Sequence, residues 1–299
     1  MYEEQTLKNN IAVITGGASG IGKSLCYRYG RAGYKICIGD IEEPALAKTV
    51  AELAKEEISA YSYTLDVSSS SSMENFTQSV LEDVGTPGIV CLNAGVGAGG
   101  PIDTTEIKDW EWVLAVNLWG VIFGVRNFLP ILKEANEGHI VFTSSIAGHL
   151  SYPGMGPYNA SKHAVLTIAE TLYFELEQIN SDVGVSALCP GLVRTGILES
   201  DRNRQEKYRV PALQQDEQGE QGEDRKELIQ EIYANSLSPD VVADLVFDAV
   251  EAKKFYIFTD NAHHDHMRIR HQRIESGNNP SLDGDLIDHI AAGVNEREK

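Results

Sequence analysis

Residues 11–22, IAVITGGASGIG, decide the fold, because an apolar run passes there directly into a glycine-rich turn. The run IAVIT predicts a buried β-strand. The turn at 15–22, TGGASGIG, stands immediately before a helical pattern. Its glycines permit a tight turn and let backbone N–H groups approach a pyrophosphate at the helix N-terminus. Three residues separate Gly16 from Gly20, so the spacing departs from the GxGxxG fingerprint, and the strand–turn–helix context carries most of the signal.

Outward from this turn, short β-rich runs alternate with longer helical patterns. Several runs are continuously apolar, which is typical of strands covered by helices on both faces. The alternation predicts an α/β fold: a doubly wound, mostly parallel seven-stranded sheet with helices on both faces. Strands are expected at 11–15, 36–40, 61–66, 89–93, 139–144, 183–188 and 255–259, and helices near 21–32, 43–57, 71–84, 106–134, 158–179 and 239–252. In such sheets the ligand crevice lies beyond the carboxyl ends of the strands.

The composition indicates one large domain with a sizeable core, since the chain has 299 residues and is 42% hydrophobic. We expect a single nucleotide-binding and catalytic domain over 1–260 and a C-terminal extension over 261–299. A net charge of −19 disfavours a nucleic-acid partner. The polar N-terminus has no signal core, and no apolar run approaches the ~18 residues of a membrane span. These features predict a cytoplasmic protein without a membrane partner.

The sequence also contains two polar regions and four cysteines. Residues 199–224 are rich in Gln, Glu and Asp, and predict a mobile lid (about 196–236) over the crevice, with a disordered linker as the alternative. The run HHDH at 263–266 could imitate a metal site, but the tail around it shows little periodicity. We therefore expect a solvated tail and no metal. The cysteines lack CxxC spacing and are expected to be buried and reduced.

Asp40 ends the second expected strand, eighteen residues after Gly22. A carboxylate there can accept hydrogen bonds from adenosine ribose hydroxyls and would repel a 2′-phosphate. Neither Ser19 nor Ile41 supplies a cation for that phosphate, so NAD is favoured over NADP. The alternative is that Asp40 only caps the next helix.

Several short motifs now occur in one order: the glycine turn, LDV at 65–67, NAG at 93–95, Asn117, Ser145, YxxxK at 158–162 and PG at 190–191. Together they resemble the short-chain dehydrogenase/reductase family, in its single-domain, Rossmann-type NAD(P)-binding form. The resemblance runs from about residue 11 to 195, and the last expected helix and strand, to 259, fit more loosely.

The resemblance implies a role for each matching position. The cofactor-binding residues would be Gly16, Ser19, Gly20, Ile21 and Gly22 in the pyrophosphate turn, Asp40 at the ribose, Asp66 and Val67 at the adenine edge, Asn93 and Gly95 beside the fourth strand, and Pro190, Gly191, Val193 and Thr195 at the nicotinamide end. The catalytic residues would be Asn117, Ser145, Tyr158 and Lys162, of which Tyr158 and Lys162 also contact the cofactor. The family places its serine thirteen residues before the tyrosine, which selects Ser145 over Ser144.

Elementary chemistry supports these roles. A free tyrosine has a pKa of about 10 and is a poor base near neutral pH. A nearby ammonium such as that of Lys162, with the positive nicotinamide ring, stabilises the phenolate of Tyr158. Ser145 would hydrogen-bond the substrate oxygen, and Asn117 would anchor a water chain that carries the proton to solvent. Taken singly, Asn117 could be a helix-kink residue, Ser145 a strand-end hydroxyl and Lys162 a surface lysine.

The sequence therefore predicts an NAD-dependent oxidoreductase that interconverts a secondary alcohol and a ketone, with Tyr158 as general acid/base. Residues 97–100 and 149–156 and the segment after Thr195 would suit a hydrophobic or cyclic substrate. The alternative is a non-catalytic NAD(H)-binding regulatory or scaffold protein on the same fold. The resemblance further implies a homodimer or homotetramer, because the family often packs the helices at 106–134 and 158–179 against partner subunits.

Overall fold

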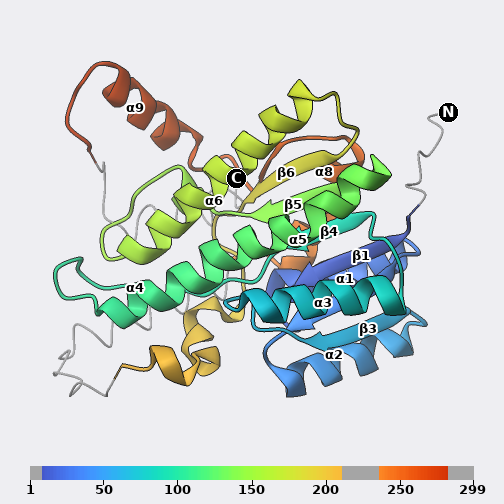
Figure 1. Cartoon of the computed structure of the whole chain (residues 1–299). Helices are drawn as coiled ribbons and strands as arrows, with labels where there is room; N and C mark the ends of the chain where they lie inside the picture. Colours follow the sequence, from blue (N-terminus) through green and yellow to red (C-terminus); the bar gives the residue numbers. More distant parts are fainter. Residues whose placement is uncertain (1–8, 211–235, 282–299) are drawn as a thin grey trace.

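The computed structural model describes residues 9–210 and 236–281. Seven strands form one sheet in the order β3-β2-β1-β4-β5-β6-β7, and every neighbouring pair is parallel (Figure 1). The strands are β1 (Ile11–Thr15), β2 (Lys35–Asp40), β3 (Ala60–Thr64), β4 (Ile89–Leu92), β5 (His139–Thr143), β6 (Gly184–Cys189) and β7 (Tyr256–Phe258). The prediction of a doubly wound, seven-stranded sheet is confirmed.

Helices cover both faces of the sheet. One layer contains α1 (Gly20–Arg31), α2 (Glu43–Lys55) and α8 (Pro239–Glu251), and the other contains α3 (Ser70–Asp83), α4 (Ile107–Leu114), α5 (Gly120–Ala135) and α6 (Gly156–Gln178). Figure 1 shows α3, α5 and α6 side by side across the front of the sheet. This arrangement explains why the strand sequences are continuously apolar: neither face is left to solvent.

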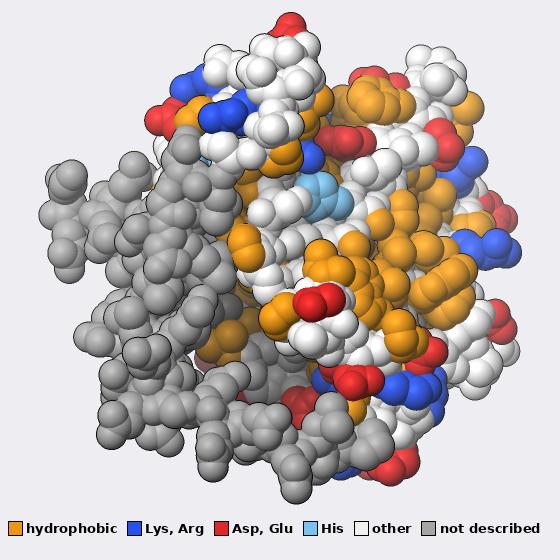
Figure 2. All heavy atoms as spheres, turned by 90° about the vertical axis from the view of Figure 1, so that its left-hand side faces the viewer, with side chains coloured by type: hydrophobic (Ala, Val, Ile, Leu, Met, Phe, Trp, Pro, Cys, Tyr) orange, Lys and Arg blue, Asp and Glu red, His pale blue; other side chains and the backbone are white. Residues whose placement is uncertain are grey.

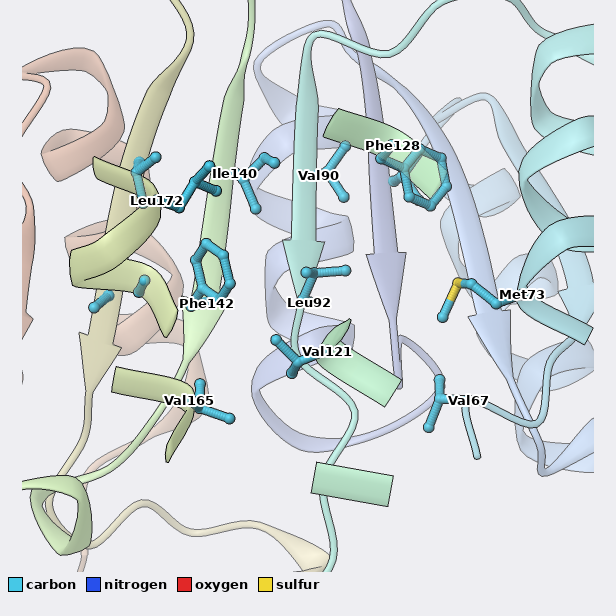
Figure 3. Close-up of a cluster of buried hydrophobic side chains, with 14 of the residues drawn as sticks. Val67, Met73, Val90, Leu92, Val121, Phe128, Ile140, Phe142, Val165 and Leu172 are labelled. Atoms are coloured by element: carbon cyan, nitrogen blue, oxygen red, sulfur yellow. The ribbon is translucent and has the colours of Figure 1, made fainter. Parts of the chain in front are cut away.

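The side chains of each central strand point alternately into two separate hydrophobic cores, one on each face of the sheet. On β4, Val90 and Leu92 belong to the core under α3, α5 and α6, whereas Ile89 and Cys91 belong to the core under α1, α2 and α8. Figure 3 shows the first core, where Ile140 and Phe142 of β5 lie beside the β4 side chains and face the helices. The period of two along the strand divides the apolar run between the two helical layers.

The expected helix at 106–134 is one continuous helical stretch containing a wide turn. α4 passes into the π-helical turn η1 (Ala115–Trp119), which leads into α5. The stretch Ile107–Ala135 is long and apolar enough to cross a membrane. The expectation that no apolar run approaches the length of a membrane span is therefore wrong. Half of its most apolar window is buried inside the protein, with Phe128 and Leu132 fully enclosed. It therefore packs as a core helix of the sheet.

The tail after residue 260, which was expected to be solvated and to show little periodicity, forms a helix in the part that the structure describes, and no residue of that helix is buried. Helix α9 (His264–Glu275) follows β7, and Met267 packs against the cluster of Leu150 and Tyr152. His263 is buried, and its ring lies behind Gly191 in the predicted nicotinamide region. Within 9–210 and 236–281, no His, Cys, Asp and Glu side chains gather as a metal site. All four cysteines are buried and free, as expected.

Candidate active site

The order in which strands are added to the sheet reverses between β1 and β4. From β1 the sheet grows outward through β2 and β3, and then returns to β4 on the other side of β1. A crevice lies beyond the carboxyl ends of the strands at this reversal, where doubly wound sheets bind ligands. Every predicted cofactor and catalytic residue lines this crevice except Gly22 and Asn117.

The glycine turn is a place where two backbones touch. Gly16 has φ of +66°, and a Cβ there would lie 2.8 Å from the Cα of Ala94. A Cβ on Gly22 would lie 2.1 Å from the carbonyl oxygen of Gly16. Only glycine fits either position, so the turn and the start of α1 can approach a ligand with bare backbone.

Thr15 and Asn93 fix this turn to the end of β4. The Thr15 hydroxyl accepts hydrogen bonds from the N–H groups of Asn93 and Ala94, at 3.0 and 3.1 Å. The Asn93 side-chain amide donates to the carbonyl oxygens of Thr15 and Gly16, at 3.0 and 3.3 Å. Asn93 lines the crevice as predicted, and its amide N–H groups hold the turn in place.

Asp40 reaches the crevice from the end of β2 with a buried, acceptor-only side chain. Its two carboxylate oxygens accept hydrogen bonds from the N–H groups of Ala18, at 2.9 Å, and Glu42, at 3.0 Å. Each oxygen keeps further acceptor capacity for a ligand hydroxyl. The N-cap of α2 is Glu42, without a side-chain cap, so the structure does not use Asp40 as the helix cap.

The two adjacent serines after β5 point to different partners. The Ser144 hydroxyl donates to the carbonyl oxygen of Lys162, at 2.9 Å, and so ties β5 to the first turns of α6. The Ser145 hydroxyl accepts from the N–H of Ala147, at 3.1 Å, and forms a hydrogen bond with Tyr158. The structure thus places Ser145 beside the tyrosine and Ser144 behind it.

Tyr158 and Lys162 lie one turn apart at the start of α6. Lys162 is buried, its Nζ donates to the carbonyl oxygen of Thr143 at 2.9 Å, and Nζ lies 5.5 Å from the centroid of the Tyr158 ring. Burial lowers the pKa of Lys162 to about 8. Burial of its hydroxyl raises the pKa of Tyr158, against a smaller lowering by the hydrogen bond with Ser145. The pair can exchange a proton with a ligand in the crevice.

Asn117 lies in the π-helical turn η1 and is fully buried, and its side-chain amide is already hydrogen-bonded within the protein. Its amide oxygen accepts from the N–H of Val96 at 2.8 Å, and its amide nitrogen donates to the Val96 carbonyl at 2.9 Å and to the Ser161 hydroxyl at 3.1 Å. A Cβ added at Gly95 would lie 3.5 Å from both the Asn117 amide oxygen and the Lys162 Nζ. Asn117 therefore lies close to Lys162 and braces the wall between β4 and α6.

The residues that cover the crevice belong to the segment predicted as a lid, although the sequence did not single out the individual residues that contact it. A segment that we call the strap, residues 196–208, contains the 3₁₀ helices η3 (Gly196–Asn203) and η4 (Glu206–Tyr208). Its crevice-lining members are Gly196, Ile197, Ser200, Arg202, Asn203 and Gln205. The expected lid thus lies over the crevice where it is described, and its residues 211–235 lie outside the described part of the chain.

The strap is anchored by paired charges. Arg204 forms an ion pair with Asp109, at 2.7 Å, and its guanidinium lies 4.0 Å from the Trp112 ring. Arg202 pairs with Glu42 at 3.1 Å. The only signal in the sequence was the run DRNRQ, whose charges could equally belong to a solvated surface.

Comparison with known proteins agrees with this geometry. The profile of the short chain dehydrogenase family matches residues 10–206, about two thirds of the chain. The chain belongs to the short-chain dehydrogenase family. The match covers the strands that build the crevice, the predicted catalytic positions and the strap as far as residue 206.

Three similar proteins illustrate the range of this short-chain dehydrogenase's relatives. A short chain dehydrogenase/reductase from Burkholderia phymatum, solved in complex with NAD, is 39% identical with a TM-score of 0.88, over 96% of this chain and 100% of that one. A C alpha-dehydrogenase from Sphingobium sp. is 32% identical over 84% of this chain and 80% of its own length. An alcohol dehydrogenase from the archaeon Thermococcus sibiricus, complexed with 5-hydroxy-NADP, is 25% identical with a TM-score of 0.68, over 84% and 96%.

The two serines give a matched pair of variants of this short-chain dehydrogenase. Ser145→Ala should lower kcat by about 10²-fold, because a substrate oxygen would lose its hydroxyl partner beside Tyr158. Ser144→Ala should keep kcat close to wild type and lower the free energy of unfolding by about 1 kcal/mol, because it removes the bond to α6. Initial rates and urea unfolding measure the two effects, and a larger loss of kcat in Ser144→Ala would reverse the assignment.

Proposed function

We propose that this short-chain dehydrogenase interconverts a secondary alcohol and a ketone with NAD, and that Tyr158 is the general acid/base. The arrangement of Ser145, Tyr158 and Lys162 at one end of the crevice carries the proposal. These are a hydrogen-bonding hydroxyl, a proton-transferring phenol and a buried ammonium. When bound, NAD supplies the hydride acceptor or donor.

Each residue has one task in oxidation. Ser145 holds the substrate oxygen, and the Tyr158 phenolate takes the hydroxyl proton as the hydride departs. The ammonium of Lys162 favours the phenolate, which opposes the effect of burial on that pKa. Both amide N–H groups of Asn117 are already used, so Asn117, close to Lys162 at Gly95, would hold by an acceptor oxygen the water chain through which the proton leaves. In reduction the same groups act in reverse, with Tyr158 donating the proton.

The walls near Tyr158 support a hydrophobic or cyclic substrate. A small apolar cluster contains Ile146, Leu150 and Tyr152, and both Met155 and Tyr158 pack against it. The crevice itself is also lined by apolar side chains, among them Val96, Trp112 and Ile197, and such a lining favours a substrate whose flanking groups are carbon-rich. Similarity to the alcohol dehydrogenase from Thermococcus sibiricus supports an alcohol donor. Four free, buried cysteines accord with a cytoplasmic location.

Tyr158→Phe should lower kcat by roughly 10²–10⁴-fold, because the ring stays in place while the transferable proton is lost. The measurement is NADH absorbance from the purified protein with NAD and a panel of secondary alcohols. Tyr63→Phe is the matched control, because its hydroxyl bonds Asp83 on the surface, away from the crevice. Wild-type turnover by Tyr158→Phe would refute the mechanism. If wild type binds NADH but oxidises none of the panel, the alternative of a binding protein gains support.

The preference for NAD over NADP can be tested with a separate variant. Wild type should prefer NAD, because the buried carboxylate of Asp40 faces the crevice and Arg202, the cation nearby, is already paired with Glu42. The double change Asp40→Ala and Ile41→Arg should shift the ratio of kcat/KM values toward NADP by roughly tenfold or more. A wild-type preference for NADP would contradict this role of Asp40.

We also propose that the chain forms a homodimer or homotetramer through the layer of α4, α5 and α6. Trp119 is 50% exposed and Phe174 is 59% exposed, which is unusual for such large apolar side chains. Figure 2 shows hydrophobic side chains gathered on the side of the molecule turned toward the viewer.

Replacing Phe174 by Glu should therefore lower the molar mass measured by light scattering after gel filtration, because a charge would be buried at the subunit contact. Val241→Glu, on α8 in the opposite helical layer, should leave that contact intact and the protein at least dimeric. A wild-type protein that is monomeric at micromolar concentration would refute the proposed contact.

A further inference from the structure

The order of the strand ends sets where each part of a dinucleotide can lie. Ser145 and Tyr158 mark the reacting end beyond β5, and the glycine turn follows β1. Asp40 ends β2, and Asp66 follows β3. A dinucleotide with its pyrophosphate at the turn and its nicotinamide beside Tyr158 therefore extends its base toward the β2–β3 end, beside Asp66.

One oxygen of the Asp66 carboxylate accepts hydrogen bonds from the protein, and the other can accept a hydrogen bond from a ligand. Its Oδ1 accepts three hydrogen bonds: from the N–H of Ser68 at 2.9 Å, from the Ser68 hydroxyl at 2.7 Å and from the Gln205 Nε2 at 2.9 Å. Within the part of the chain that the structure describes, Oδ2 accepts none. Asp66 lines the crevice, so Oδ2 is an acceptor for a ligand.

Gln205 of the strap presents a second acceptor in the same place. Its Nε2 donates to the Asp66 Oδ1 and to the Ser68 hydroxyl, at 2.9 and 3.3 Å. Rotating the amide would set its oxygen against the carboxylate, so these contacts fix which end is the oxygen. The Oε1 is buried and has no hydrogen-bond partner among the described residues. Gln205 lines the crevice, and a donor on a bound ligand would remove the cost of this unpaired group.

The strap around Gln205 is held on both sides. Arg204, the preceding residue, is pinned between Asp109 and the Trp112 ring. Asn203 donates to the Glu42 carboxylate at 3.2 Å. The amide is thus held before a ligand arrives, which reduces the ordering cost of binding.

The family resemblance already implies that Asp66 lies at the adenine edge. We propose that Gln205 of the strap joins Asp66 in recognising the exocyclic amino group of adenine. That amine carries two N–H donors, and the crevice offers two acceptors, the Asp66 Oδ2 and the Gln205 Oε1. Hypoxanthine carries a carbonyl oxygen at the same position, which would face both acceptors and bond neither. The pair therefore selects adenine dinucleotides over their deaminated counterparts. This inference rests on the proposed NAD-dependent function and adds a base-recognition residue from the strap.

Binding of two reduced cofactors to the full-length protein tests the pair. NADH and reduced nicotinamide hypoxanthine dinucleotide share the fluorescent nicotinamide, so both dissociation constants can be measured by fluorescence titration without turnover. Wild type should bind NADH roughly 10- to 100-fold more tightly. In Gln205→Met this ratio should fall by roughly three- to tenfold. Lys207→Met is the control, because Lys207 contacts Ser68 from the same strap without lining the crevice, and its ratio should match wild type.

An NADH analogue with one methyl group on the exocyclic amine separates recognition from support of Asp66. It keeps one N–H, so wild type should bind it roughly three- to tenfold more weakly than NADH, whereas Gln205→Met should bind both alike. If Gln205 only braced Asp66, a single N–H would suffice and methylation would cost wild type nothing.

The outcomes separate this inference from the function on which it rests. Equal binding of NADH and the hypoxanthine cofactor by wild type, or an unchanged ratio in Gln205→Met, overturns the recognition by Gln205 even if alcohols are oxidised normally. The expected ratios without any alcohol oxidation uphold the recognition and refute only the proposed reaction. Failure of NADH to bind overturns both.

Discussion

The Thr15 hydroxyl joins β1 to β4 at the point where the sheet order reverses, and the crevice is built outward from that junction. It accepts two consecutive N–H groups, of Asn93 and Ala94, and this brings the two backbones into contact. Gly16 must then lack a side chain, because a Cβ would fall 2.8 Å from the Cα of Ala94. One residue further on, Gly95 leaves the opening in which Asn117 and Lys162 approach each other. The glycine turn and the lysine are thus positioned by the short segment that follows β4.

A second tie fixes the reacting end. The Ser144 hydroxyl reaches the carbonyl oxygen of Lys162, and Lys162 in turn donates from Nζ to the carbonyl oxygen of Thr143. These two bonds run in opposite directions between β5 and α6, so strand and helix cannot slide past each other. A Cβ on Gly148 would lie 2.4 Å from the Ser144 oxygen, which keeps this contact free of side chains. Ser145 and Tyr158 face each other because their neighbours are locked in this way.

The sequence sufficed for features with a local or repeated signal. Continuous apolar runs located the central strands, because burial on both faces leaves that pattern, and the alternation of β-rich and helical patterns located the edge strands β3 and β7. The ordered motifs located the residues that line the crevice. The strap is different. Its anchors are single pairs far apart in the chain, such as Arg204 with Asp109 and Gln205 with Asp66, and nothing in DRNRQ distinguishes them from a solvated run. Helix α9 was missed for a related reason: none of its residues is buried and half of them are exposed, so it lacks an apolar face to predict it. The side chain of Asn117 was predicted from a motif, but its bonds to Val96 and Ser161 are tertiary and required coordinates.

Burial acts on the catalytic pair in a direction that the reaction must overcome. It raises the pKa of Tyr158 and lowers that of Lys162 to about 8, so burial shifts each group toward its neutral form. Oxidation requires the opposite charges, a phenolate and an ammonium. Lys162 cannot supply the whole effect, because at alkaline pH it loses its proton while Tyr158 still holds its own. In the proposed mechanism, an oxidised nicotinamide ring would add a second positive charge beside the tyrosine when bound. The alcohol would then lose its proton most readily when a hydride acceptor is present.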